Sequence, residues 1–281
     1  KIILENGRAV GVHIMHEDRV LRAKAVMSTL DPHTTFLDMI GEASLPASLT
    51  DSVKGWVWDK WSFNTLHIAA DEAPQYVTDD PWINQAFATV IGIESVDQLL
   101  AHWGNVSKGT IDLNSFGGHS TCESLFDPTL SDRPGKYVSM FQIHAPYGLK
   151  GGWVRRREEI KAAMLTKWQK AAPNLKGKII STAMEDPEEI EIRFPNMRRG
   201  SIKHGDYRPL QMGCYRPNQE CSSTGTPIEG LYVCGVSTYP GGLVLGGPGY
   251  LGANKVAEDL GIKKWWKPTP VMERYIKTYL E

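Results

Sequence analysis

The chain has 281 residues, of which 41% are hydrophobic, and its 31 basic and 32 acidic side chains give a net charge of −1. This balance excludes a global field that would attract nucleic acid, so we expect no nucleic-acid partner. No apolar run is long enough for a transmembrane helix, so we expect a soluble, cytoplasmic or otherwise intracellular protein, with peripheral membrane contact left open. The four cysteines show neither CxxC nor zinc-ligand spacing, so we expect reduced thiols and no metal site.

The first 30 residues have the pattern of a β-meander. Apolar runs at 1–4 and 9–15 flank the turn signal Asn6-Gly7, and a third run covers 20–30. The third strand is expected to stop at Asp31-Pro32, because proline has no N–H to continue a ladder.

The centre of the chain alternates strand and helix signals. Ser95 with Gln98 three residues later forms a capping-box signal, and the run 156–173 carries apolar residues at four-residue steps before Pro173. Asp186 before Pro187 indicates a further helix start. The pattern predicts a strand that leaves into a loop within 63–74, a strand over 136–147, and helices over 95–103 and 156–173.

A glycine-rich turn between a strand and a helix is the main motif of the C-terminal part. The apolar run 230–238 predicts a buried strand, and "YPGGLVLGGPGYLG" follows it at 239–252 before a helix that ends at Gly261. Glycines there either let a ligand approach the positive end of the helix or serve tight helix–strand packing. Spacing alone leaves both interpretations open, since the literal GxGxxG at 247–252 lacks the other parts of a dinucleotide fingerprint.

The residues of this motif carry a resemblance to a known family. The segment "TPIEGLYVCGVSTYPGGLVLGGPGYLGANKVAEDL", 226–260, resembles the C-terminal flavin-binding motif of the phytoene desaturase-like flavoproteins of the amine oxidase superfamily. Segments 6–36, 124–147 and 193–212 are similar to other parts of that family in the expected order. The closest similarity is to the pyridine nucleotide-disulfide oxidoreductase domain 2-like members.

The resemblance implies an α/β (α+β) fold in which FAD lies across a Rossmann-type domain and faces a substrate domain. This chain would hold an incomplete Rossmann-type FAD domain and a mixed-sheet substrate domain with helices on one side. The expected division is 1–40 and 223–262 in the FAD-binding domain, 41–222 in the substrate domain, and 263–281 as a C-terminal helical tail.

The resemblance also implies a set of cofactor-binding residues in the glycine-rich turn. Their small size would let the backbone approach the flavin, and the helix beginning near Pro248 would direct its positive end at the ring. The set is Gly235, Val236, Ser237, Gly241, Gly242, Leu243, Gly246, Gly247, Pro248 and Gly249.

Catalytic residues are not assigned, because flavin enzymes of this type need little side-chain chemistry. His204 is a candidate, with a structural hydrogen bond as its alternative role. Tyr239 is a second candidate, at a position where many members of the family have histidine. Arg216 is expected either to hold a carboxylate or flavin phosphate or to form a surface ion pair.

The family's N-terminal GxGxxG segment is not in this sequence. We therefore expect FAD binding to need an N-terminal FAD-binding polypeptide or segment as partner. The resemblance implies an FAD-dependent oxidoreductase that desaturates, saturates or isomerises a hydrophobic small molecule, with this chain as its C-terminal portion or one subunit. The alternative is a non-catalytic subunit or scaffold that keeps the fold and binds a partner protein.

Overall fold

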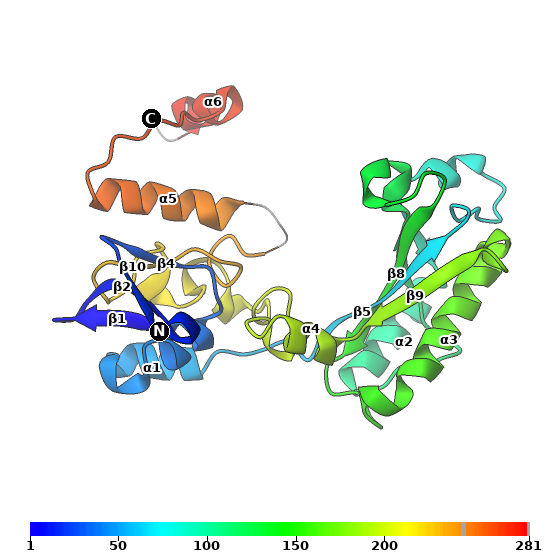
Figure 1. Ribbon diagram of the computed structural model, residues 1–281, viewed down its shortest axis with the longest axis horizontal. Helices are drawn as coiled ribbons and strands as arrows, with labels where there is room; N and C mark the ends of the chain where they lie inside the picture. The colour runs from blue at the N-terminus through cyan, green and yellow to red at the C-terminus, as the bar shows by residue number, and fades with distance from the viewer. Residues whose placement is uncertain (243–245, 280–281) are drawn as a thin grey trace. The chain divides into compact units, whose positions relative to one another are not determined.

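The computed structural model describes residues 1–242 and 246–279, which belong to two compact units. The first unit combines Lys1–Val57 with Lys203–Glu281, and the second is Trp58–Ile202. Helices and sheets occur in both units, which confirms the predicted α/β class (Figure 1). The assignment of FAD-binding and substrate domains to parts of the chain stays a prediction.

The first unit opens with the predicted meander. Its antiparallel sheet has the order β1 (Ile2–Glu5), β2 (Arg8–Ile14) and β3 (Arg19–Arg22). The turn between β1 and β2 takes positive φ at Asn6 and Gly7, as the Asn-Gly signal predicts.

The single strand predicted over 20–30 is wrong, because this run divides between two sheets. β3 is exposed and stays in the meander, whereas β4 (Val26–Ser28) buries Val26 and Ser28 and pairs in parallel with β10 (Leu231–Val233). One strand cannot serve both sheets, so the chain leaves the meander before Val26.

Three α-helices complete the described part of the first unit: α1 (Ala47–Lys54), α5 (Gly247–Asp259) and α6 (Pro270–Tyr279). Residues from β4, β10 and α1 share one hydrophobic core, in which Phe36 and Leu49 are fully buried. α5 packs against β10 through Gly252, where an added Cβ would lie 2.6 Å from the Cβ of Cys234.

The second unit is built on a five-stranded sheet with the order β6-β7-β8-β5-β9. Its strands are β5 (Trp61–Ala70), β6 (Ala88–Ile91), β7 (Gly118–Thr121), β8 (Tyr137–Pro146) and β9 (Ile179–Glu185). Every pairing in it is antiparallel, where a mixed sheet was expected. The reason is that β5 lies between β8 and β9 and runs antiparallel to both. β8 and β9 are therefore parallel to each other but not adjacent, and α3 (Trp153–Ala171) lies between them in the sequence.

α3 packs against one face of this sheet, as Figure 1 shows. Its stripe of Ile160, Met164 and Trp168 is fully buried, as its four-residue spacing predicts. α2 (Val96–Ser107) contacts β8, and the hydroxyl of Ser95 accepts a hydrogen bond from the N–H of Gln98 at 3.2 Å. This contact confirms the predicted helix cap.

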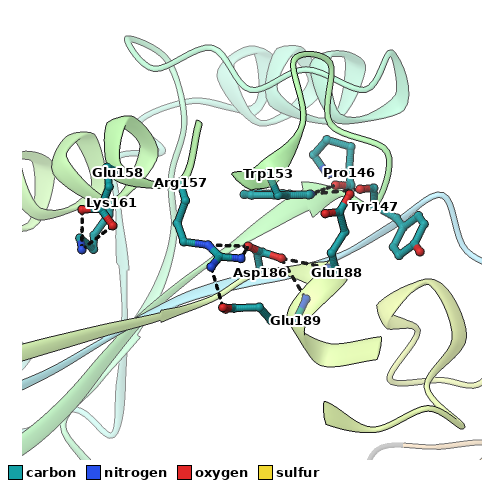
Figure 2. Close-up of polar contacts among 9 residues, drawn as sticks. All are labelled: Pro146, Tyr147, Trp153, Arg157, Glu158, Lys161, Asp186, Glu188 and Glu189. Atoms are coloured by element: carbon teal, nitrogen blue, oxygen red, sulfur yellow. Dashed lines mark hydrogen bonds and ion pairs between the residues drawn. The ribbon is translucent and has the colours of Figure 1, made fainter. Parts of the chain in front are cut away.

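Asp186 connects β9, α3 and α4 (Pro187–Arg193) in the second unit (Figure 2). Its carboxylate accepts hydrogen bonds from the N–H groups of Glu188 and Glu189, both at 3.0 Å, which confirms the predicted cap. The other carboxylate oxygen receives the Arg157 guanidinium at 2.5 Å, and Arg157 also contacts Glu189 at 2.7 Å. A fully buried carboxylate is thus matched by a cation and two amides.

Candidate functional site

The candidate site lies where the parallel strands β4 and β10 end. The N–H of Cys234 still bonds to the carbonyl of Ser28 at 3.0 Å, and one loop then follows each strand. The two loops stay in contact, because the Ser237 hydroxyl donates to the carbonyl of Leu30 at 3.4 Å. In open α/β sheets, ligands bind at the carboxyl ends of parallel strands, so this edge is the expected place for one.

Packing explains several of the predicted glycines. A Cβ on Gly235 would lie 2.1 Å from the carbonyl oxygen of Thr29, so no side chain fits there. A Cβ on Gly242 would lie 2.3 Å from a methyl carbon of Val236, and one on Gly247 would lie 3.0 Å from Pro240. Tight packing, the alternative left open by the sequence, therefore accounts for these positions.

Two glycines at the start of α5 face open space. Among the described residues, an added Cβ meets nothing within 4 Å at Gly246 or Gly249, and of the two only Gly246 needs glycine for its backbone, with φ +64. Gly249 has neither a crowded neighbour nor positive φ. The first turn of α5, which contains Pro248, also presents N–H groups that have no partner within the helix. These features suit an anionic or electron-rich group at this helix end.

Arg216 holds the base of the site together. It is fully buried, and its guanidinium donates to the carbonyl oxygens of Lys203 at 2.5 Å, Gln211 at 3.2 Å and Val236 at 3.2 Å. Its charge thus fixes the backbone of the predicted flavin-contact residue Val236. The expected surface ion pair is wrong, because Arg216 is fully buried, whereas its expected role in holding a carboxylate or flavin phosphate stays a prediction.

Tyr207 connects Arg216 to the glycine-rich turn. Its ring lies 4.7 Å from the Arg216 guanidinium, and its hydroxyl accepts a hydrogen bond from the N–H of Gly242 at 2.8 Å. A Cβ on Gly241, where φ is +107, would lie 2.7 Å from the same hydroxyl. The backbone at Gly241 and Gly242 is therefore held in one position by a single aromatic side chain.

His204 is buried in the same region, with 2% of its surface exposed. Its carbonyl accepts a hydrogen bond from the indole N–H of Trp56 at 2.9 Å, and a Cβ on Gly205 would lie 2.3 Å from that indole nitrogen. Burial lowers the pKa of His204; the Asp31 charge opposes this effect in part, and the Arg216 charge, which has the smallest effect of the three, lowers the pKa further. A neutral imidazole is favoured there.

Tyr239 lies apart from that buried network. It is 51% exposed and borders a hollow of about 410 Å³ that Thr224 and Leu251 also line. Leu243, the remaining predicted contact, lies outside the described residues. The structure therefore places His204 in the interior and Tyr239 at the surface.

Sequence reasoning missed the roles of Trp56, Tyr207 and Gln211. Gln211 accepts from the N–H of Val57 and donates to its carbonyl, both at 2.8 Å. Tyr207 and Gln211 lie within the long irregular stretch 194–227, whereas Trp56 is far from it in the sequence. A stretch of this kind indicates a functional or disordered segment but does not identify contacts with distant residues.

A second feature lies on the face of the five-stranded sheet opposite α3. There Trp61, Phe63, Trp103, His119 and His144 form what we call the aromatic cluster. The His144 ring lies 4.4 Å from Trp103, 5.0 Å from Trp61 and 5.0 Å from Phe63. On β5, Trp61 and Phe63 lie on this face, and the residue next to Phe63, Asn64, lies on the other. There its side-chain amide contacts the sulfur of Met164 on α3 at 3.1 Å. Burial lowers the pKa of His119.

Comparison with known proteins gives a consistent group of relatives. The chain is 34% identical to one subunit of the limonene dehydrogenase of Castellaniella defragrans, over 95% of this chain and 51% of that protein. It is 28% identical to mouse pyridine nucleotide-disulfide oxidoreductase domain-containing protein 2, over 90% of the chain and 45% of that protein. Prolycopene isomerase of Daucus carota is 22% identical, over 94% of the chain and 40% of that protein. No protein-family model matches the chain.

A solved structure supports the fold. An oxidoreductase from Methanosarcina mazei superimposes with a TM-score of 0.50 and 18% identity, over 92% of this chain and 48% of that one. The chain spans about half the length of the curated relatives that it matches. Among the described residues, no helix is long and apolar enough to cross a bilayer.

Proposed function

The chain is a homologue of the phytoene desaturase-like oxidoreductases, and from this we propose that it forms the C-terminal portion or one subunit of an FAD-dependent oxidoreductase. Its substrate would be a hydrophobic small molecule that the complete enzyme desaturates, saturates or isomerises. Bound FAD would supply the hydride acceptor or donor.

The observation that carries this proposal is the open space at Gly249, beside the N-terminus of α5 and the ends of two parallel strands. A flavin fits that environment, because its polar ring edge suits a helix N-terminus and its flat ring needs a side-chain-free approach. The predicted contact set, from Gly235 to Gly249, would hold and orient the ring. Arg216 and Tyr207 would act behind it by fixing the backbone at Val236 and Gly242.

A partner segment would complete the sheet. In the described residues β4 and β10 are the two strands of their sheet, and β10 makes one further bridge, between Tyr232 and Gly225. Parallel sheets are normally larger and covered on both faces. An N-terminal FAD-binding polypeptide or segment would supply the missing strands. The greater length of the relatives supports this proposal, as does the fact that the limonene dehydrogenase relative is one subunit of its enzyme.

The aromatic cluster would contact the hydrophobic substrate. Its rings come from β5, β7, β8 and α2, on the sheet face that α3 does not cover. Partly exposed rings offer a large apolar contact area with little entropy to lose on binding. Tyr239 and His204 stay candidates for proton transfer, and the burial of His204 favours a structural role.

A matched pair of variants tests the flavin site. Gly249 and Gly104 are both helical glycines for which an added Cβ has no neighbour within 4 Å in the described part of the chain. In the complex with its partner segment, Gly249→Leu should keep the fold and lose bound flavin, while Gly104→Leu should keep both. Flavin absorbance per mole of protein, with circular dichroism as the control for folding, gives the readout.

Equal flavin retention in both variants would refute the predicted site. A stable complex that never binds flavin, even when FAD is added, would instead support the alternative of a non-catalytic subunit or scaffold.

A further inference from the structure

The C-terminal segment 263–279 combines two features that the proposed oxidoreductase function does not use. We call this segment the basic tail; it contains α6 and the preceding "KKWWKPT". The first feature is charge. The basic tail contains five basic residues and one acidic residue, Glu273, so its net charge is +4. Because the whole chain has a net charge of −1, the rest of the chain has a net charge of −5. The basic residues are Lys263, Lys264, Lys267, Arg274 and Lys277.

The second feature is an apolar face. At 100° per residue, Val271, Met272, Tyr275, Ile276 and Tyr279 fall on one side of α6, and Glu273, Arg274 and Lys277 fall on the other. Val271 is 80% exposed and Tyr279 is 72% exposed. Within the described residues, this face therefore remains open to solvent.

Tryptophan adds to the exposed apolar surface. Trp265 is 86% exposed, whereas the indole N–H of the neighbouring Trp266 donates to the side-chain oxygen of Asn254 on α5 at 3.2 Å. Lys264 pairs with Glu258 of α5 at 2.6 Å. These contacts anchor the start of the basic tail on α5 and leave Trp265 and α6 projecting their apolar groups.

We propose that the basic tail binds the surface of an anionic lipid membrane. Charge complementarity selects this occupant, because Lys and Arg on one face attract anionic headgroups while Trp and Tyr prefer the boundary between headgroups and acyl chains. The tail would lie in the plane of the interface, with Val271 and Tyr275 directed into it. This contact is independent of the flavin site.

Co-sedimentation with vesicles tests the proposal on the full chain, together with any partner that co-purifies. Vesicles of phosphatidylcholine mixed with phosphatidylglycerol are compared with vesicles of phosphatidylcholine alone. We expect binding to the anionic vesicles that weakens with added salt. Lys267→Gln combined with Lys277→Gln should weaken binding about thirtyfold, from roughly fivefold for each basic residue near the surface. Trp265→Ala should weaken it roughly tenfold.

Matched controls come from the second unit. Trp82 is 70% exposed, and Lys170 and Lys176 are exposed lysines there. Trp82→Ala and the pair Lys170→Gln with Lys176→Gln should leave vesicle binding unchanged. The proposal is overturned if the anionic vesicles bind no more protein than the neutral ones, or if tail and control variants bind equally. It is also overturned if the tail variants bind lipid normally but lose a co-purifying partner, since the tail would then be a protein-docking element.

Discussion

Replacing Arg216 with methionine tests whether a buried cation holds the base of the candidate site. The variant keeps much of the side-chain volume but leaves the carbonyl oxygens of Lys203, Gln211 and Val236 without their guanidinium donor. Each buried acceptor without a partner costs about 1 to 3 kcal/mol, and removing the buried charge itself offsets part of the sum. We expect a net loss of about 3 kcal/mol, a large fraction of a typical stability of about 5 to 15 kcal/mol.

Urea unfolding followed by circular dichroism measures this loss. With a slope of about 2 kcal/mol per molar urea, the midpoint of the first unit should fall by about 1.5 M. Arg208→Met is the matched control, because the Arg208 side chain is 47% exposed and forms a surface ion pair with Asp206 at 3.0 Å. That variant should shift stability by less than about 0.5 kcal/mol. Equal midpoints for the two variants would refute the role given to Arg216.

Three further results are expected. Asp186→Ala should destabilise the second unit by about 3 to 5 kcal/mol in urea unfolding, because it leaves the Arg157 charge poorly matched and removes a helix cap; a loss below about 1 kcal/mol would contradict this. The pKa of His204 lies below its usual 6.5 in the folded state, so the unfolded state binds more protons, and the free energy of unfolding should fall as the pH drops below about 6.5. In urea unfolding at a series of pH values, His204→Asn should reduce this fall in the free energy of unfolding. An unchanged dependence on pH would contradict the lowered pKa of His204. A thiol reagent at neutral pH should label Cys214 first, because this cysteine is exposed. Cys221 should react only after unfolding, because burial raises its pKa to about 12. Labelling of both cysteines at the same rate would contradict the burial of Cys221.

Local signals in the sequence predicted much of the secondary structure. Ser95 and Asp186 cap helices as expected, Asn6-Gly7 forms the hairpin turn, and Pro173 follows the end of α3. Each signal acts within a few residues, so its physical cause is visible in the sequence.

Relations between distant segments were not visible in the same way. The run 20–30 divides between two sheets because β10, some 200 residues later, pairs with its second half. Arg216 and Tyr207 position the glycine-rich turn through contacts that no spacing rule describes. Only the structure distinguishes glycines required by packing from the others. An added Cβ at Gly235 would collide with Thr29, whereas one at Gly249 would meet no described residue within 4 Å.

Whether this chain completes a flavin-binding domain is tested most directly by the visible absorption spectrum of natively purified material, with intact mass analysis of every polypeptide in it. We expect the bands of an oxidised flavin together with an N-terminal FAD-binding segment or partner chain. A complete complex with that partner that stays colourless after addition of FAD would contradict the proposed flavin site.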